Sequence, residues 1–206
     1  MAATKTAKKS TRKPAAKRRP ANLDATFLLP PKDDLHLMIE EWVAEDVGLQ
    51  DLTTNVMIPA NAKADFVMNT RENIVIAGIE VAAEVFRHMV PGAKVKVMVK
   101  DGTLAKKGTS LMRITGPGRG LLTAERTSLN ILQFMCGIAT LVREYVSRIE
   151  HTNAQLIDTR KTIPGLRMLS KYSACVGGCR PHRLGLHDGV MIKDNHIAVH
   201  GSITKA

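Results

Sequence analysis

Hydrophobic and polar positions alternate along the chain with two different periods, and each period predicts a different kind of element. In residues 33–48, "DDLHLMIEEWVAEDVG", apolar side chains recur at helical spacing and a glycine ends the run. The apolar positions are Leu35, Leu37, Ile39, Trp42 and Val43. We predict an amphipathic helix that ends at Gly48, with Trp42 packed against the protein core.

A period of two follows in residues 62–80 and 93–117, which is typical of strands. The first of these segments is broken by "REN", so we expect two strands that pair across that turn. The second is broken by "DG" and "KG", two strong turn signals. A short helix, "AEVFRHMV", lies between the two segments. Residues 25–118 are therefore expected to form an α+β unit with a small antiparallel sheet.

The period changes again after residue 120. Residues 121–150 have apolar side chains spaced by three and four, which predicts a long helix with Thr123 as its N-cap. A strand at 154–160, a helix at 165–178 and a strand at 189–197 should follow, with glycine at the C-terminal end of the helix. Strand, helix and strand in this order predict a parallel crossover. The fold class is thus α+β followed by α/β.

Charge is unevenly distributed along the 206 residues. The net charge is +11, but residues 1–20 hold eight Lys and Arg and no acid, so the remaining 22 bases and 19 acids carry only +3. We predict a disordered basic tail over residues 1–22, which acts as a solvated extension or as an arm for polyanions. The predicted domains are this tail, an α+β sandwich at 23–120 and a partial α/β barrel at 121–206.

Three cysteines without a secretion signal favour a reducing compartment, and no segment is long and apolar enough to span a membrane. We expect a cytoplasmic protein. A basic transit peptide for an organelle stays open as an alternative, although its lysine clusters and two prolines suit an amphipathic helix poorly.

Cationic side chains gather where the predicted parallel strands end. "DTRK" (Asp158–Lys161) closes the first strand, "KDNH" (Lys193–His196) closes the second, and "RPHR" (Arg180–Arg183) lies between them. Ligands of parallel α/β folds bind at the carboxyl ends of the strands, and Arg and Lys there indicate a strongly anionic ligand. Lys193 is expected to be buried in its strand, whereas Arg167 and Lys171 are expected to be surface residues or ion-pair partners.

Four motifs in order carry a resemblance to a known family, from about Asp34 to Ile203. They are "EDVGLQDLTT", "LLTAERTSLNILQFMCGIAT", "DTRKTIPGLRMLSKYS" and "HRLGLHDGVMIKDNHI". Together they closely resemble the quinolinate phosphoribosyltransferases. The resemblance implies that quinolinate and phosphoribosyl pyrophosphate are converted, with Mg²⁺, to nicotinate mononucleotide, pyrophosphate and carbon dioxide in NAD synthesis.

The same resemblance implies roles for particular residues. Arg160, His182, Arg183 and Lys193 would line the quinolinate pocket, with Thr159 beside them and Lys161 near the phosphoribosyl group. Lys161 and Lys193 are the expected catalytic residues. Arg126, in "AER", would reach the active site of the other subunit, so a homodimer or larger assembly with a shared site is expected.

The chain also departs from the family pattern. "GGCRPHR" replaces a glycine-rich segment and an Asn-His-Arg triplet, which puts Cys179 at a glycine position and Pro181 before His182. A β-carbon at Cys179 would clash if that position needed a positive φ. Ile163 and Gln50 are milder departures. Family members continue beyond this chain into a complete open barrel that carries the acidic metal ligands, so we expect a truncated member with no metal ligands of its own.

Four alternatives compete with this function. A catalytically inactive partial homologue, or a polyanion-binding protein acting through the basic tail, would keep the fold without the activity. A zinc site could use Cys175, Cys179 and His182, with His187 further on, although the spacing is loose. A sister family with a similar fold uses nicotinate, but the number of cations favours a dicarboxylate.

Overall fold

The computed structural model describes residues 25–205 of the chain, so the predicted tail at residues 1–22 lies outside the described residues. The elements run in the order η1 (Thr26–Leu28), α1 (Lys32–Val47), α2 (Leu52–Met57), β1 (Lys63–Asn69), β2 (Ile74–Val75), α3 (Ile79–Met89), β3 (Lys94–Val97), β4 (Leu104–Ala105), β5 (Ser110–Pro117), α4 (Gly118–Ile149), α5 (Arg167–Gly177) and α6 (Asp194–His200). Among the described residues, no helix is long and apolar enough to cross a membrane.

The first part of the chain forms the predicted small antiparallel sheet. Its strand order is β1-β5-β3, and a separate two-stranded ribbon pairs β2 with β4. The expected pairing across "REN" is wrong, because β1 pairs with β5, where Phe66 lies opposite Ile114. These two residues point to the same face of the sheet, toward the core. The sheet is therefore held by contacts between distant segments.

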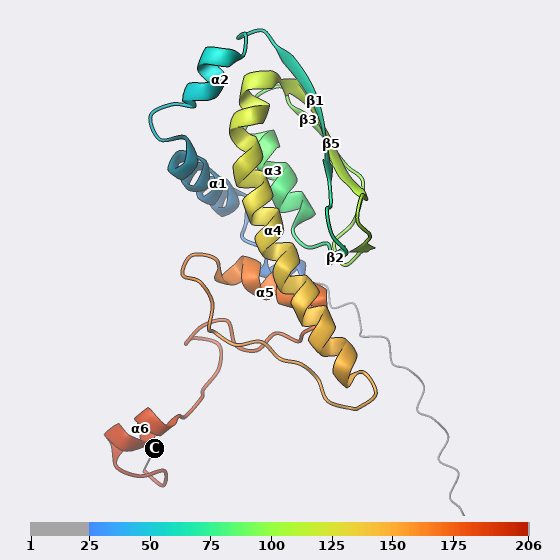
Figure 1. Ribbon diagram of the computed structural model, residues 1–206. Coiled ribbons are helices and arrows are strands. Elements are labelled where there is room, and N and C mark those ends of the chain that lie inside the picture. The colour runs from blue at the N-terminus through green and yellow to red at the C-terminus, as the bar shows by residue number, and fades with distance from the viewer. Residues whose placement is uncertain (1–24, 206) are drawn as a thin grey trace, which may run out of the picture.

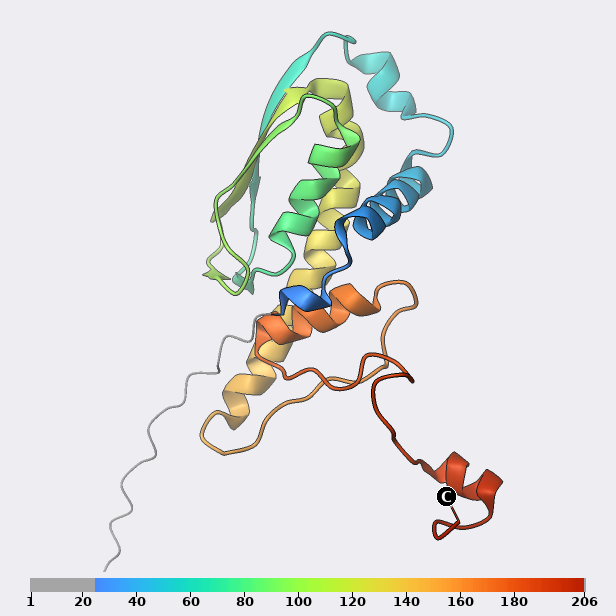
Figure 2. The same ribbon diagram turned by 180° about the vertical axis from the view of Figure 1, so that it is seen from behind.

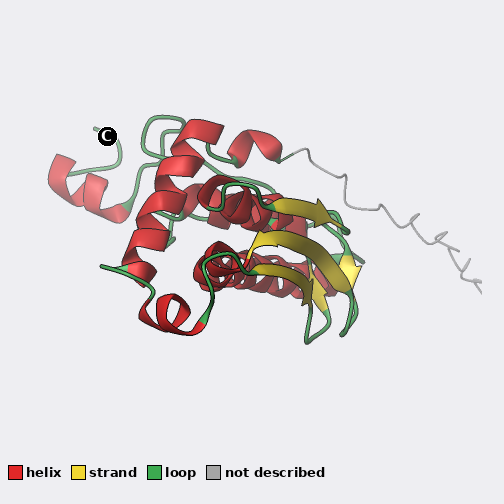
Figure 3. Cartoon of the chain, turned by 90° about the horizontal axis from the view of Figure 1, so that it is seen from above, coloured by secondary structure: helices red, strands yellow, loops and turns green. Residues whose placement is uncertain are grey.

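Two helices cover one face of the sheet, and α1 packs on their far side (Figures 1 and 2). The sheet stands as a layer beside the helices when the molecule is seen from above (Figure 3). The core between the layers contains Phe86 of α3, Met112 and Ile114 of β5, and Leu121 of α4, all almost fully buried. Trp42 packs against this core, as predicted, and α1 ends at Gly48. Leu37, however, is mostly exposed.

The long predicted helix is present as α4, but it begins at Gly118 rather than at Thr123. The first turn of α4 contains glycines because neighbouring residues approach the helix closely there and leave little room for a β-carbon. A β-carbon on Gly120 would lie 2.7 Å from Val90 Cγ1. Thr123 lies inside the helix, where its hydroxyl is within hydrogen-bond distance of two acceptors, Arg119 O at 3.0 Å and Asp51 Oδ2 at 2.9 Å. Since α4 runs through residue 120, the predicted division into domains there stays a prediction.

Helix α5 crosses the second half of α4 and ends at Gly178, as predicted for this segment. The two helices approach closely, because a β-carbon on Gly177 would lie 2.7 Å from Ala139 O. Arg143 of α4 donates to the last carbonyls of α5, at 2.9 Å to Gly177 O. A second core cluster, which includes Met135 and Leu169, fills this junction.

The two predicted parallel strands, at 154–160 and 189–197, do not form as strands, so this prediction is wrong. The first is reduced to one isolated parallel bridge between Ile157 and Arg180. Residues 190–193 form no strand and are exposed, and α6 begins directly after them. A strand is defined by its pairing, and within the described residues this segment has no partner. We call residues 186–205 the C-terminal arm; in Figures 1 and 2 α6 stands apart from α4 and α5.

Candidate active site

The bridge between Ile157 and Arg180 brings two of the predicted site segments together. Arg180 N donates to Leu156 O at 2.8 Å, and Asp158 N donates to Arg180 O at 3.2 Å. Because the bridge is parallel, residues 159–161 and residues 181–183 leave it in the same direction. Two cationic segments that are some twenty residues apart in the sequence therefore begin side by side.

Lys171 was expected to be a surface residue or an ion-pair partner; it is an ion-pair partner, and it is buried rather than at the surface. Its side chain is only 1% exposed, and its Nζ donates to Asp158 Oδ1 at 2.6 Å and to His182 O at 3.3 Å. Asp158 Oδ1 also accepts the backbone N–H of His182 at 2.8 Å. Helix α5 turns this lysine inward, toward the bridge. A charged pair thus lies beneath the two site segments.

Arg167, expected as a surface residue or an ion-pair partner, is half-buried and connects neighbouring loops. Its Nη1 donates to Leu184 O at 3.4 Å, and its Nε donates to Thr162 Oγ1 at 3.3 Å. One bond reaches the loop after Lys161 and the other reaches the loop after Arg183. The first turn of α5 therefore helps to hold the site segments in place.

The side chains on the first segment differ in exposure. Thr159 and Lys161 are exposed, and the Thr159 hydroxyl accepts the backbone N–H of Lys161 at 3.1 Å, which tightens the turn. Arg160 is half-buried, and its Nε has no hydrogen-bond partner although it is shielded from solvent. An arginine with an unused donor beside two further cationic positions is suited to an anionic ligand.

The second segment presents an exposed His182 and a half-buried Arg183. Arg183 Nη1 donates to Gly189 O at 2.8 Å, across a loop that Asp188 closes by accepting the backbone N–H groups of Leu184 and Gly185. Those two backbone donors hold the pKa of Asp188 below its usual value. The loop keeps Arg183 in place while His182 faces solvent.

Cys179 is accommodated more easily than its position suggested. The positive φ of this region belongs to Gly178, at +109°, and within the described residues only glycines have a positive φ. Cys179 is buried, and burial raises the pKa of its thiol to about 12. Burial likewise raises the pKa of the Cys175 thiol to about 11, with Asp158 adding to the effect. Among the described residues, no group of three or more His, Cys, Asp or Glu side chains is placed to hold a metal ion, so the structure does not assemble the zinc site considered from the sequence.

Lys193 lies elsewhere, on the C-terminal arm. It was expected inside a buried strand, but it is exposed and occupies the N-cap of α6. Its backbone N–H donates to His196 Nδ1 at 3.0 Å. The segment has no sheet around it in the described part of the chain, so no burial is imposed on the ammonium group.

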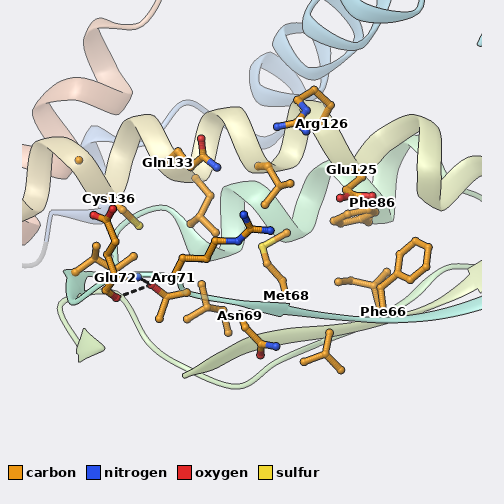
Figure 4. Close-up of a pocket in the computed structure, with 18 of the residues that line it drawn as sticks. Phe66, Met68, Asn69, Arg71, Glu72, Phe86, Glu125, Arg126, Gln133 and Cys136 are labelled. Atoms are coloured by element: carbon orange, nitrogen blue, oxygen red, sulfur yellow. Dashed lines mark hydrogen bonds between the residues drawn. The ribbon is translucent and has the colours of Figure 1, made fainter. Parts of the chain in front are cut away.

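Arg126 lies in a cleft of the sandwich, between α4 and the sheet, with a volume of about 870 Å³. The cleft has an apolar floor that includes Phe66, Met68 and Phe86. Arg126 and Gln133 border it from α4, and Arg71 extends into it from the end of β1 (Figure 4). Arg126 is 17 residues before Arg143 of the same helix, or about 25 Å along its axis from the end of α5.

The predicted site residues therefore fall into three groups. Thr159, Arg160, Lys161, His182 and Arg183 gather around the bridge, whereas Arg126 is in the sandwich cleft and Lys193 is on the C-terminal arm. Sequence reasoning missed the cleft and the Lys171–Asp158 pair. The cleft had no signal in the sequence, since strand β1 and helix α4 are distant along the chain. The only hint of the pair was an acid directly before "TRK".

Comparison with known proteins places this arrangement in a family. The N-terminal domain of quinolinate phosphoribosyl transferase, as a family model, matches residues 51–136, and the C-terminal domain matches residues 138–206. The probable carboxylating nicotinate-nucleotide pyrophosphorylase of Synechocystis is 41% identical over 179 residues, which are 86% of this chain and 60% of that protein. A carboxylating nicotinate-nucleotide pyrophosphorylase of Mycobacterium leprae is 46% identical over 76% of this chain and 56% of its own length.

A solved structure agrees with the sequence relatives. The crystal structure of NadC from Streptococcus pyogenes matches with a TM-score of 0.81 at 35% identity, over 86% of this chain and 63% of that one. The chain thus spans about 60% of the length of the relatives it matches. Both domain models of one family match consecutive parts of the chain in their proper order, and the chain belongs to the quinolinate phosphoribosyltransferase family.

Proposed function

We propose that this chain binds quinolinate at the cluster around the Ile157–Arg180 bridge and takes part in its phosphoribosylation and decarboxylation to nicotinate mononucleotide. The observation that carries the proposal is the convergence of Arg160, His182 and Arg183 from two segments onto one place, with Arg160 Nε unpartnered. Quinolinate carries two adjacent carboxylates, which guanidinium groups bind through paired hydrogen bonds. The names of the relatives describe the same chemistry.

The chemistry requires positioning and charge stabilisation rather than a nucleophile from the protein. The pyridine nitrogen of quinolinate attacks the anomeric carbon of phosphoribosyl pyrophosphate, and the bond to pyrophosphate breaks with development of positive charge on the ribose. Loss of carbon dioxide then leaves an electron pair on the ring carbon next to the quaternised nitrogen, which is protonated. Arg160 and Arg183 would orient the carboxylates, and the exposed Lys161 would face the phosphoribosyl group.

Mg²⁺ would enter this reaction with phosphoribosyl pyrophosphate. The part of the chain that the structure describes contains no group of three or more His, Cys, Asp or Glu side chains able to hold a metal ion. These residues therefore do not fit a resident magnesium site, and we assign no step to the ion through them.

Arg126 is the proposed contribution to the site of a second subunit. It is exposed on α4, in the sandwich cleft and away from the cluster around the bridge. That separation supports a role in a neighbouring copy of the chain, and hence a homodimer or larger assembly. Lys193 is the remaining proposed quinolinate ligand, with Lys161 a catalytic residue, and Lys193 must approach the bridge from the C-terminal arm to act there.

Titration calorimetry with quinolinate tests the proposal directly. The parent chain should bind quinolinate, and Arg160→Ala should weaken the affinity about 10- to 100-fold, since a charge-assisted pair contributes about 1.5–3 kcal/mol. Nicotinate, with one carboxylate, should bind more weakly than quinolinate to the parent chain. This comparison separates the proposal from the nicotinate-using alternative.

Arg148→Ala is the matched control, because Arg148 is an exposed arginine of α4 that forms an ion pair with Glu144 on the helix surface. It should leave quinolinate affinity unchanged. Equal affinity of the parent chain and Arg160→Ala would refute the pocket. Formation of nicotinate mononucleotide in the presence of phosphoribosyl pyrophosphate and Mg²⁺ would extend the result from binding to turnover, whereas binding without product would favour the inactive homologue.

A further inference from the structure

We propose that Lys171 is a positioning residue for the quinolinate pocket, and that it acts by joining Asp158 and His182 beneath the two site segments. This inference rests on the proposed function. Lys171 does not belong to the ligand-binding group itself, because its side chain is 1% exposed and lies under the segments rather than at their surface. Its effect on a ligand must pass through the residues that it holds.

A gain in folding stability does not explain why the Lys171–Asp158 pair is buried. The Lys171 side chain is 1% exposed and that of Asp158 is 9% exposed, and taking two charges out of water costs about as much as their attraction returns. Two apolar side chains of similar volume would stabilise the fold at least as well. Retaining two buried charges is therefore best explained by the specific contacts that they make.

Those contacts extend the backbone pairing beyond the point where it stops. The bridge supplies two backbone hydrogen bonds, between Arg180 and Leu156 and between Asp158 and Arg180. Two residues further on, His182 N–H donates to Asp158 Oδ1 at 2.8 Å and His182 O accepts from Lys171 Nζ at 3.3 Å. Both backbone polar groups of His182 are thus held by the charged pair instead of by a neighbouring strand.

The residues on either side of the pair are the proposed quinolinate ligands. Asp158 is followed by Thr159 and Arg160, and His182 is followed by Arg183. The 2.6 Å contact between Lys171 Nζ and Asp158 Oδ1 therefore fixes the separation of Arg160 from His182 and Arg183. A displacement of about 1 Å of the residues in such a site is enough to lose much of its ligand affinity or of the reaction rate.

Helix α5 gives the pair a rigid base. Most of its residues near Lys171 are buried, with Leu169 and Ser173 fully inaccessible and Tyr172 only slightly exposed. Tyr172 also donates to Asp101 of the sandwich at 2.6 Å. The position of Lys171 is thus set by the junction of α4 and α5, and it is transmitted to both site segments.

The test compares two variants that differ in stability but share the loss of the ionic contact. Lys171→Met leaves Asp158 as an unpaired buried charge, so its thermal midpoint should fall. Lys171→Met combined with Asp158→Leu removes both charges, and its midpoint should return to within about 5 °C of the parent chain. Quinolinate affinity by calorimetry should be at least tenfold weaker in both variants. Val85→Ala, a core truncation in α3, controls for lost stability alone and should keep the parent affinity.

A second measurement reads the contact without ligand. Amide hydrogen exchange at His182 should be at least about tenfold faster in both Lys171 variants than in the parent chain, whereas the amide of Val90, which donates to Phe86 O at 3.0 Å at the C-terminal end of α3, should be unchanged. The control amide lies in the sandwich, and neither of its bonded groups contacts α5.

Each outcome either supports or overturns the positioning role of Lys171. If the double variant regains quinolinate affinity together with stability, the positioning role of Lys171 is overturned and the proposed function stands. Parent-like quinolinate affinity in Lys171→Met would have the same meaning. Failure of the parent chain itself to bind quinolinate would overturn the proposed function, and the inference with it. Unchanged exchange at His182 would overturn the contact on which the inference depends.

Discussion

At the scale of single residues, burial governs the chemistry of the cysteines. Cys136 of α4 lies against the backbone of Ala77, with Sγ 3.4 Å from Ala77 N, and burial raises the pKa of its thiol to about 11. The thiols of Cys175 and Cys179 have pKa values raised to about 11 and about 12 by the same cause. All three act as small apolar side chains whose charged form the interior excludes.

We therefore predict that the protein loses stability in alkaline solution through its thiols. The pKa of each thiol is about 9 when unfolded and higher when folded, so the stabilising contribution is complete below about pH 9 and is lost as the pH rises toward 11–12. At pH 10 the loss should be about 1 kcal/mol for each thiol. Urea unfolding at pH 8, 9 and 10 measures this.

The triple variant Cys136→Ala, Cys175→Ala, Cys179→Ala provides the control, because it lacks the three thiols and keeps every other side chain. Its free energy of unfolding should decline less steeply between pH 8 and 10 than that of the parent chain. Equal slopes would mean that the thiols titrate alike in the folded and unfolded states.

At the scale of elements, Asp101 connects the sandwich to α5. Its Oδ2 accepts the backbone N–H of Gly78 at 2.8 Å and its Oδ1 accepts that of Ile79 at 3.0 Å, which satisfies the free donors at the start of α3. Oδ2 also accepts the Tyr172 hydroxyl at 2.6 Å. One carboxylate thus begins a helix of the sandwich and anchors a helix that carries the site.

Asp101→Ala should lower the free energy of unfolding by about 2 kcal/mol, because it removes both the cap and the bond to Tyr172. Tyr172→Phe removes one hydroxyl and should cost about 1 kcal/mol. Urea unfolding measures both values. Glu80→Ala is the control: Glu80 is in the first turn of α3 but pairs only with Arg87 at the surface, so a change below about 0.5 kcal/mol is expected. A loss from Glu80→Ala as large as that from Asp101→Ala would show that charge near the helix end, rather than the specific bonds, stabilises α3.

The elements that could be predicted from the sequence are those whose pattern is local. The helical spacing in α1, α3, α4 and α5 follows from a buried face within each segment, and the glycines after α1 and α5 mark their ends. The pairing of β1 with β5 could not be predicted, because alternation shows which face is buried but not which strand is the neighbour. Lys171 was expected as a surface residue or an ion-pair partner, but its partner and its burial could not be predicted: Asp158 is 13 residues away, and helical spacing alone does not identify an inward-facing cation.

At the scale of the whole molecule, the described chain divides into a well-packed body and an exposed C-terminal arm. The body has two core clusters joined through α4. On the arm, Leu186, Val190 and Val199 are at least 77% exposed. The resemblance identified Lys193 as a ligand of the site, but the strand that was to bury it has no pairing partner among the described residues.

The C-terminal arm should be open to proteolysis. Lys193 is exposed in a segment without strand pairing, so trypsin should cleave after Lys193 sooner than after Lys94 of β3, which lies in the paired sheet. If Lys193 joins the quinolinate pocket as proposed, saturating quinolinate should slow cleavage at Lys193, because binding withdraws the segment from the protease. Mass spectrometry of timed digests would follow both sites, and Arg160→Ala should abolish the protection. Cleavage at Lys193 that is equally fast with and without bound quinolinate would exclude Lys193 from the pocket and leave the cations around the bridge to bind quinolinate without it.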